Sequence, residues 1–346
     1  MKGSDPMKAL FYPAWDRLEM RDVPEPSPKP GEVVLKVLAV GICGSELHGF
    51  KIHAPRRTPP LIMGHEFSGE VLAIGPGVSG YRVGDVVAVN STISCGACDA
   101  CVEGDPHVCP TAEVYGTKRP GAFAERVAAP VSTLMPMPEN VTPVQASLME
   151  PLGNGVHAWS MIRRRFPEAV VIFGAGAIGL FTLQVARAAG AGRIAVVDVS
   201  PARLAVAKRL GAERTLNART DDVLAGVRDF TRGRGADVAI DAVGAAGTRD
   251  LAVKAIRKGC ECVWLGLHDD ATTVGGLDIV LGEKAIYGSF AVRPRDLRAA
   301  LHLLGAGKIA LDGWVRTFPL TDGAGVFMQL VSAPPDDYIK AVLLPS

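Results

Sequence analysis

The sequence has few aromatic residues and almost no net charge. Aromatic residues make up 6% of the 346 residues, and 37 Lys and Arg are balanced by 36 Asp and Glu, giving a formal net charge of +1 at pH 7. This balance excludes the strongly basic surface with which many proteins bind nucleic acid or an anionic membrane. We therefore expect neither nucleic acid nor a membrane as a partner.

Long apolar runs of the kind that cross a membrane are also missing. The most apolar stretch, Val170–Ala186, contains three glycines and Gln184. It is better explained as a buried strand followed by a helix. The first six residues, Met1–Pro6, precede a second methionine and resemble an expression-tag remnant rather than a signal peptide. We expect a cytoplasmic protein.

What the sequence does contain is typical of an α/β protein with two domains. Hydrophobic residues make up 48% of the chain, and there are 39 glycines. Residues 7–150 consist of short strand-like segments separated by Gly and Pro. From about residue 168, strand patterns such as Ala169–Phe173 and Arg193–Val197 alternate with helical ones such as Ala177–Ala189. This alternation predicts a parallel sheet with helices on both faces.

A glycine-rich motif connects the first of these strands to the first helix. Gly174, Gly176 and Gly179 form the pattern GxGxxG, with Ala177 and Ile178 between the last two glycines. The first glycine permits a tight turn, the second lets the backbone approach a pyrophosphate, and the third allows close packing of helix on strand. The free N–H groups of the helix N-terminus would then bind the phosphates.

An acidic residue indicates which dinucleotide is bound. Asp198 ends the next strand, 19 residues after Gly179. Its carboxylate can accept hydrogen bonds from both ribose hydroxyls and would repel a 2′-phosphate, which favours NAD over NADP. Arg203 could stack on the adenine or weaken this discrimination. An ordinary Gly-rich turn with a surface aspartate is the alternative.

Four of the seven cysteines are closely spaced. Cys95, Cys98, Cys101 and Cys109 form the pattern C-x2-C-x2-C-x7-C. In a chain that is not secreted, this spacing indicates metal ligands rather than disulfides. Four thiolates can enclose one tetrahedral structural zinc. An iron–sulfur cluster or four unligated thiols are the alternatives.

Other candidate ligands are scattered along the chain. Cys43 lies in the segment GICGS, His65 and Glu66 in the segment GHE, and Glu150 begins the segment EPLGNGVH. A catalytic zinc needs about three protein ligands and one open position, which distant segments can supply. Their spacing alone does not bring these residues together, because a lone Cys or His is more often part of a core.

With these motifs the chain resembles the zinc-dependent medium-chain dehydrogenases of the alcohol dehydrogenase superfamily, from Met7 nearly to the C-terminus. The resemblance implies a GroES-like distorted β-barrel catalytic domain, formed by residues 7–155 and 291–346. It further implies a Rossmann NAD-binding domain, residues 156–290, with the active site between the two. A homodimer or homotetramer and a small-molecule alcohol or ketone substrate are implied as well.

The resemblance also assigns roles to single residues. Cys43 and His65 would bind the catalytic zinc, and Glu66 and Glu150 would complete its shell or hold the metal-bound water. Ser45 and His48 match the proton relay of the family, which would deprotonate the alcohol through the nicotinamide ribose. Two Zn²⁺ ions per subunit are thus expected, one catalytic and one structural.

Within the superfamily, the segment Glu150–His157 resembles the polyol and threonine dehydrogenase branches. The interval from His48 to Gly64 lacks the Trp-rich segment associated with threonine dehydrogenases. This favours a polyol, sugar or aminocyclitol over a hydroxy amino acid such as threonine. Glu46 departs from the Asp usual in the family, so the loop around it is expected to be slightly reshaped. Lys118 and Arg119 could recognise an anionic substrate or belong to a solvated loop.

Two other classes of function compete with an NAD-linked dehydrogenase of secondary alcohols. A non-catalytic NAD-binding protein that kept the fold should show a damaged metal shell. A zinc-free quinone reductase should lack both the ligands and the cysteine lobe. The residues Cys43, His65, Glu66 and Glu150 are all present.

Overall fold

The computed structural model describes residues 6–345, which divide into two compact units. The first unit comprises residues up to Glu150 together with Arg293–Gly305 and the residues from Trp314 onward. The second comprises Pro151–Val292 and Ala306–Gly313. Of the expected tag remnant, residues 1–5 lie outside the described residues, and Pro6 begins the first strand.

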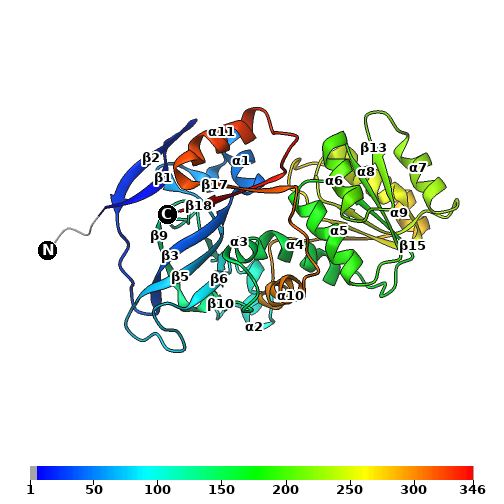
Figure 1. Ribbon diagram of the computed structural model, residues 1–346. Coiled ribbons are helices and arrows are strands. Elements are labelled where there is room, and N and C mark those ends of the chain that lie inside the picture. Colours follow the sequence, from blue (N-terminus) through cyan, green and yellow to red (C-terminus); the bar gives the residue numbers. More distant parts are fainter. Residues whose placement is uncertain (1–5, 346) are drawn as a thin grey trace. The chain divides into compact units, whose positions relative to one another are not determined.

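Antiparallel strands dominate the first unit (Figure 1). One sheet has the strand order β2-β1-β4, and a larger one has the order β10-β6-β5-β3-β18-β17, with β9 also paired to β3. The C-terminal strand β18 therefore lies beside β3 from the beginning of the chain. The strands are β1 (Pro6–Ala14), β2 (Arg17–Pro24), β3 (Glu32–Gly41), β4 (Leu61–Ile62), β5 (Glu66–Ile74), β6 (Val86–Val89), β7 (Thr92–Ile93), β8 (Glu113–Val114), β9 (Arg126–Pro130), β10 (Leu134–Pro136), β17 (Val315–Pro319) and β18 (Lys340–Leu344).

Short helices connect these strands. Helix α3 begins with a capping box, in which Thr142 and Gln145 each bind the other's backbone N–H. Helix α4 (Met149–Ser160) starts in the first unit and continues in the second. The helices of the first unit are α1 (Gly44–Lys51), η1 (Pro55–Arg57), α2 (Asp99–Val102), η2 (Pro106–Val108), η3 (Val131–Thr133), α3 (Pro143–Ser147), α10 (Pro294–Gly305), η4 (Leu320–Asp322) and α11 (Gly323–Ser332).

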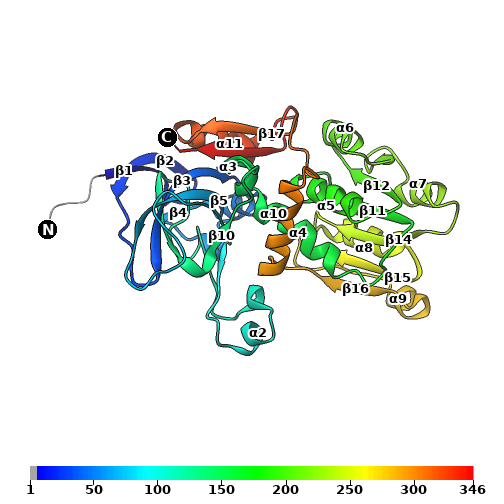
Figure 2. The same cartoon turned by 60° about the horizontal axis from the view of Figure 1, so that its bottom comes forward.

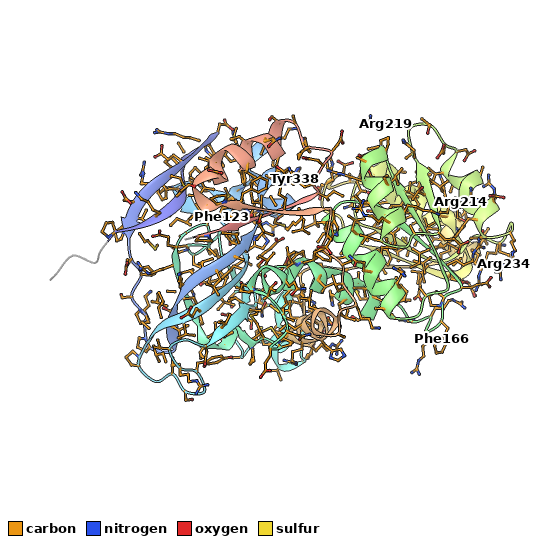
Figure 3. All side chains as sticks on the ribbon, viewed as in Figure 1. Phe123, Phe166, Arg214, Arg219, Arg234 and Tyr338 are labelled. Atoms are coloured by element: carbon orange, nitrogen blue, oxygen red, sulfur yellow. The ribbon has the colours of Figure 1, made fainter. Side chains whose placement is uncertain are left out.

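The core of the first unit contains many of the chain's few aromatic residues. Phe50 packs against Phe327 with ring centroids 5.3 Å apart, and Phe67 packs against Tyr115 at 5.1 Å. Phe123 lies among the strands of this unit (Figure 3) and is fully buried. These edge-to-face contacts join strands and helices from distant parts of the sequence, which holds the scattered segments of the unit together.

The second unit contains a six-stranded parallel sheet in the order β13-β12-β11-β14-β15-β16. Counted from the first strand of this unit, this is the order 3-2-1-4-5-6 of the Rossmann fold. The prediction of a doubly wound parallel sheet is confirmed. Its strands are β11 (Ala169–Phe173), β12 (Arg193–Asp198), β13 (Arg214–Asn217), β14 (Ala236–Asp241), β15 (Ile256–Trp264) and β16 (Ala285–Gly288).

Every residue of β11 is buried, which indicates that both faces of this sheet are covered. Val171 and Phe173 belong to one hydrophobic cluster with residues of α7 and α8, whereas the alternating residues Val170 and Ile172 face the other side and are fully buried too. The helices are α5 (Ala177–Ala188), α6 (Pro201–Arg209), α7 (Val223–Phe230), α8 (Ala246–Ala255) and α9 (Gly276–Gly282).

The apolar stretch Val170–Ala186 falls into β11, the glycine-rich turn and α5. Within residues 6–345, no helix has both the length and the apolar character needed to cross a bilayer.

Candidate functional site

The four-cysteine segment forms a lobe around α2 that extends away from the strands of the first unit (Figure 2). The Sγ atoms of Cys95 and Cys101 are 3.9 Å apart, those of Cys98 and Cys101 are 3.5 Å apart, and those of Cys109 and Cys95 are 3.6 Å apart. A disulfide needs sulfurs about 2.05 Å apart, so these thiols are not paired covalently. An ion pair between Asp105 of the lobe and Arg293, directly before α10, restrains the position of the lobe.

These distances fit a tetrahedral metal site. Four sulfurs bound to zinc at about 2.3 Å would be about 3.8 Å from one another, close to the separations found here. Backbone hydrogen bonding from Cys95, together with the Thr111 side chain and backbone, lowers the pKa of the Cys109 thiol to about 6. The donor set and its geometry therefore suit a closed zinc site.

Cys43 lies at the N-terminus of α1, where it acts as the N-cap. Its Sγ accepts hydrogen bonds from the backbone N–H of Ser45 at 3.5 Å and from the Ser45 hydroxyl at 3.2 Å. These two donors restrain the sulfur at the start of the helix. The segment GICGS thus fixes the position of Cys43 Sγ, the atom that would bind a metal.

The orientation of His65 is fixed by Glu46. The Oε1 of Glu46 accepts from His65 Nδ1 at 2.9 Å and from the Gly64 backbone N–H at 2.8 Å, while its Oε2 accepts from the Cys43 backbone N–H at 3.0 Å. With Nδ1 engaged, Nε2 is the ring nitrogen left for a metal. Glu46 is fully buried. Its side chain reaches both ligand-bearing segments at once.

Glu66 forms an ion pair with Lys340, which the sequence analysis did not single out. The Lys340 ammonium donates to Glu66 Oε2 and, at 2.8 Å, to the carbonyl oxygen of Ile42. Both side chains are buried. Only the pairing of β18 with β3 brings Lys340 to this place, so no local pattern could have revealed it.

Cys43, His65 and Glu66 come together, as their ligand atoms all lie within 4.8 Å of one another. The buried Oε1 of Glu66 has no hydrogen-bond partner among the described residues, which leaves it available as a ligand. Glu150, in the first turn of α4, is buried but is not part of this group. A thiolate, an imidazole and a carboxylate suit zinc, and three ligands leave one position open.

Negative charge dominates this group of side chains. Burial alone would lower the pKa of His65, but the charges of Glu46 and Cys43 outweigh it and raise that pKa well above its usual value. Burial would also lower the pKa of Lys340, but the charges of Glu66 and Cys43 outweigh this effect and raise it. The same negative charges would stabilise a metal cation, whose binding requires the neutral form of His65.

The two relay candidates lie three residues apart on α1. Ser45 and His48 therefore lie on the same side of the helix. Ser45 is exposed, and its hydroxyl donates to Cys43 Sγ and accepts from Arg57 Nη2 at 3.1 Å. Arg57 is buried and was also missed by the sequence analysis, because nothing in its local pattern distinguishes it from Arg56.

In the second unit the glycine-rich turn has the geometry that its motif requires. Gly174 has φ +99°, a conformation that L side chains rarely adopt. A Cβ atom on Gly179 would lie 1.8 Å from the carbonyl oxygen of Gly174. A Cβ on Gly176 would meet no atom within 4 Å, so open space faces this residue, and Ala177 and Ile178 begin α5 directly after it.

Asp198 ends β12 beside this turn. Its Oδ2 accepts from the backbone N–H of Ala175 at 2.6 Å, and its Oδ1 accepts from that of Ser200 at 2.9 Å. Arg203 lies in the first turn of α6, where its backbone N–H donates to the Ser200 side chain. The carboxylate is thus anchored next to the glycine-rich turn, as a ribose-binding residue must be.

Lys118 and Arg119 have partners within the first unit. Arg119 forms an ion pair with Glu32 at 2.9 Å and lies over the ring of Tyr115, while Lys118 donates to the carbonyl oxygen of Ala112. Their charges are engaged in structural contacts, which agrees better with a surface-loop role than with substrate recognition.

Two family models match the chain. The alcohol dehydrogenase GroES-like domain matches residues 29–139, and the zinc-binding dehydrogenase domain matches residues 177–306. Among characterised relatives, L-threonine 3-dehydrogenase of Pyrococcus horikoshii is 37% identical over 85% of this chain and 86% of its own length. D-arabitol-phosphate dehydrogenase of Enterococcus avium is 34% identical over 92% of both.

Solved structures agree with this family. A zinc-binding dehydrogenase of Sinorhizobium meliloti 1021 bound to NADP superposes with a TM-score of 0.91 at 29% identity, covering 99% of this chain and 100% of the other. Acetophenone reductase of Geotrichum candidum in complex with NAD superposes with a TM-score of 0.87 at 27% identity, covering 99% and 98%. The chain belongs to the zinc-dependent medium-chain dehydrogenases, in the polyol and threonine dehydrogenase branch, and is an oxidoreductase acting on CH–OH groups.

Proposed function

We propose that this protein oxidises a secondary alcohol to a ketone by transferring a hydride to NAD, with one catalytic and one structural zinc per chain. The observation that carries the proposal is the meeting of Cys43, His65 and Glu66, whose ligand atoms lie within 4.8 Å of one another. The unpartnered Oε1 of Glu66 and the Nδ1 contact of His65 with Glu46 support metal binding by this set. Glu150 would replace Glu66 or hold a water beside the metal.

Zinc held by these side chains would act as a Lewis acid that lowers the pKa of an alcohol hydroxyl, and the nicotinamide would accept the hydride. The residues of the chain would then transfer the proton of the alcohol hydroxyl. Ser45 is exposed, and its hydroxyl, 3.2 Å from Cys43 Sγ, would accept the alcohol proton as it gives up its own. His48, on the same side of α1, would take up the proton that Ser45 releases through the nicotinamide ribose and would pass it to solvent.

Lys340 and Glu46 would position the ligands during this reaction. Lys340 balances the charge of Glu66 and restrains its Oε2, so that Oε1 remains the free oxygen. Glu46 restrains His65 and the Cys43 backbone together. Neither residue needs to contact the substrate for this role, because fixed ligand orientation is what keeps one coordination position open.

NAD is the cofactor that Asp198 favours. Its carboxylate, 9% exposed and held by two backbone N–H groups, would accept hydrogen bonds from ribose hydroxyls and repel a 2′-phosphate. Gly174, Gly176 and Gly179, with Ala177 and Ile178, would hold the pyrophosphate at the N-terminus of α5. Arg203 would contact the adenosine part.

Two substrate classes fit the relatives of the chain. The leading candidates are polyols, sugars and aminocyclitols, since the interval from His48 to Gly64 lacks the Trp-rich segment of threonine dehydrogenases. The second class is hydroxy amino acids, which is supported by the 37% identity to L-threonine 3-dehydrogenase of Pyrococcus horikoshii. Both classes place a polar substituent next to the reacting carbon.

A second copy of the chain is the expected partner. Among the described residues, strand β16 is the last strand of the second unit's sheet and pairs with β15, so its other edge has no strand partner. Nearby α9 exposes the apolar side chains of Leu277, Val280 and Leu281. These features support a homodimer, which light scattering on the purified protein would test.

The test of the proposed function is a screen of NAD reduction over polyols, sugars, aminocyclitols and hydroxy amino acids, with NADP in parallel. We expect activity with NAD on at least one class and none from Cys43→Ala, with folding of the variant checked by circular dichroism. Cys260→Ala is the matched control, because Cys260 lies in the hydrophobic core of the second unit. Absence of activity across the panel with zinc-loaded protein, or full activity of Cys43→Ala, would contradict the proposal.

A further inference from the structure

A buried arginine lies in an otherwise open segment beside the proposed catalytic site. Arg57 is 9% exposed, although most of the segment from Lys51 to Pro60 is exposed. The preceding residue, Arg56, belongs to the same short helix η1 and is exposed. Burial of one of two adjacent arginines needs a reason, because removing a guanidinium from water costs free energy unless it gains partners.

The partners that the chain provides for Arg57 are few. Its Nη2 donates to Ser45 Oγ at 3.1 Å, whereas its Nε is buried and has no hydrogen-bond partner among residues 6–345. Within that same part of the chain, no carboxylate lies at ion-pair distance from it. A neutral hydroxyl is thus its main side-chain contact.

Glu46 is the carboxylate whose charge acts on Arg57, but it does not satisfy the guanidinium. The charge of Arg57 contributes to lowering the pKa of Glu46, after the larger opposing effect of burial and the effect of His65. Both oxygens of Glu46 are engaged by other donors, namely the Gly64 and Cys43 backbone N–H groups and His65 Nδ1. The guanidinium therefore retains unused hydrogen-bonding capacity.

Arg57 lies close to residues that are proposed to take part in the reaction. Ser45 Oγ, which accepts from Arg57, donates in turn to Cys43 Sγ at 3.2 Å. Two hydrogen bonds therefore separate the guanidinium from a proposed zinc ligand. Ser45 is exposed, so a small molecule that contacts its hydroxyl would lie close to Arg57 Nη2, which donates to that hydroxyl at 3.1 Å.

We propose that Arg57 is a specificity-determining residue that binds an anionic group, a carboxylate or a phosphate, carried close to the carbinol carbon of the substrate. A guanidinium offers several N–H donors in one plane, and this arrangement matches the oxygens of such groups. The inference rests on the proposed function and shifts the preference among its substrates toward compounds that carry such a group: hydroxy acids, including hydroxy amino acids, and phosphorylated polyols. A neutral polyol would leave the buried charge without an anion.

The experiment compares matched pairs of substrates on zinc-loaded enzyme with NAD. Each pair has one member that carries a carboxylate or a phosphate, called the anionic member, and one that lacks this group, called the neutral member: L-threonine with L-threoninol, 3-hydroxybutyrate with 1,3-butanediol, and D-arabitol 1-phosphate with D-arabitol. The first two pairs detect a carboxylate, and the third detects a phosphate. The proteins are the parent, Arg57→Met, Arg57→Lys and the control Arg56→Met, with zinc content and folding checked for each.

We expect the parent to prefer the anionic member of at least one pair. Arg57→Met should lower kcat/KM for that member by about 10- to 100-fold, the range of a hydrogen bond to a charged group, mainly through KM. Its effect on the neutral member should be less than about threefold, well below one such bond. Arg57→Lys keeps the charge without the planar fork and should fall in between. Arg56→Met should match the parent.

Two outcomes would overturn the inference: a parent enzyme that shows no preference for anionic members, or an Arg57→Met variant that loses both members of a pair equally. The second outcome would mean that Arg57 acts only on Ser45 or on folding. If no alcohol is oxidised, the proposed function fails, and calorimetric binding of 3-hydroxybutyrate without nucleotide decides about Arg57 separately. Binding weakened by Arg57→Met but not by Arg56→Met supports the inference, and binding that is absent or unaffected contradicts it.

Discussion

Lys340, in the last strand of the chain, neutralises Glu66 at the start of β5. The two residues are 274 positions apart in sequence, and both side chains are buried. The same ammonium also binds the carbonyl oxygen of Ile42, directly before Cys43. The return of the chain to the first unit thus supplies a cation that holds two ligand-bearing segments in place.

Removing this cation should destabilise the protein. Lys340→Met leaves the Glu66 carboxylate buried without its counter-ion, so we expect a loss of about 3–5 kcal/mol in the free energy of unfolding. The urea midpoint of zinc-free protein measures this, because zinc at the site would itself act as a counter-ion of Glu66, and the exposed Lys29→Met is the control. The double variant Lys340→Met/Glu66→Gln should recover part of the loss. A change below about 1 kcal/mol in the single variant would argue against a stabilising ion pair.

Glu46 should act on zinc rather than on substrate. Glu46→Gln keeps the size of the side chain but weakens its contacts with His65 and with the Cys43 backbone. We expect about 10- to 100-fold weaker binding of one of the two zinc ions, measured by competition with a chromophoric chelator. The exposed Glu139→Gln should leave both affinities unchanged. Equal affinities in Glu46→Gln and the parent would show that His65 needs no such support.

The sequence predicted features that depend on local pattern. The strand Ala169–Phe173, the turn at Gly174 and the helix from Ala177 follow from periodicity and from φ values that glycine alone tolerates easily. The cysteine lobe was equally clear because its four cysteines lie close together in sequence, from Cys95 to Cys109. Features that depend on long-range pairing were not visible: Lys340 reaches Glu66 through strand pairing, and the burial of Arg57 rather than Arg56 depends on tertiary packing.

The resemblance to the family identified candidate zinc ligands that their spacing in the sequence could not identify. Cys43 and the pair His65 and Glu66 are separated by more than twenty residues, and only the folded chain places their ligand atoms close together. The resemblance did not predict the contacts of Glu46. Its carboxylate binds His65 and the Gly64 backbone N–H, and this could be recognised only from the structure.

Cofactor choice should depend on the charge of Asp198. Asp198→Asn retains an oxygen that can accept a backbone hydrogen bond but removes the repulsion of a 2′-phosphate. The ratio of kcat/KM for NAD to that for NADP should therefore fall at least about tenfold, which corresponds to about 1.4 kcal/mol. The two cofactors measured on one preparation serve as mutual controls. An unchanged ratio would mean that another residue selects the cofactor.

Asp237 should make the stability of the protein depend on pH. Burial alone would raise its pKa, but the backbone N–H groups of Ala169 and Glu168 and the guanidinium of Arg257 outweigh this and lower it. Because the folded-state pKa is the lower one, the stabilisation is present above the unfolded pKa of about 3.9 and is lost as the pH falls through the folded value.

Asp237→Asn tests this dependence. It should cost about 2 kcal/mol near neutral pH, since it removes hydrogen bonds to a charged acceptor. The difference between parent and variant in urea unfolding should shrink as the pH drops below about 4. Loss of zinc at low pH affects both proteins alike, so it cancels in the difference. A difference that stays constant down to pH values of about 3 would contradict the assigned pKa shift.

We propose that the chain holds two zinc ions, one of them in the open site of Cys43, His65 and Glu66. Native mass spectrometry of desalted protein, with alcohol oxidation measured on the same samples, tests it most directly. We predict two zinc ions per chain in the parent and one in Cys43→Ala, with oxidation lost in that variant. Cys98→Ser should lose the other ion, because Cys98 belongs to the cysteine lobe. Two bound zinc ions and undiminished oxidation in Cys43→Ala would contradict the account.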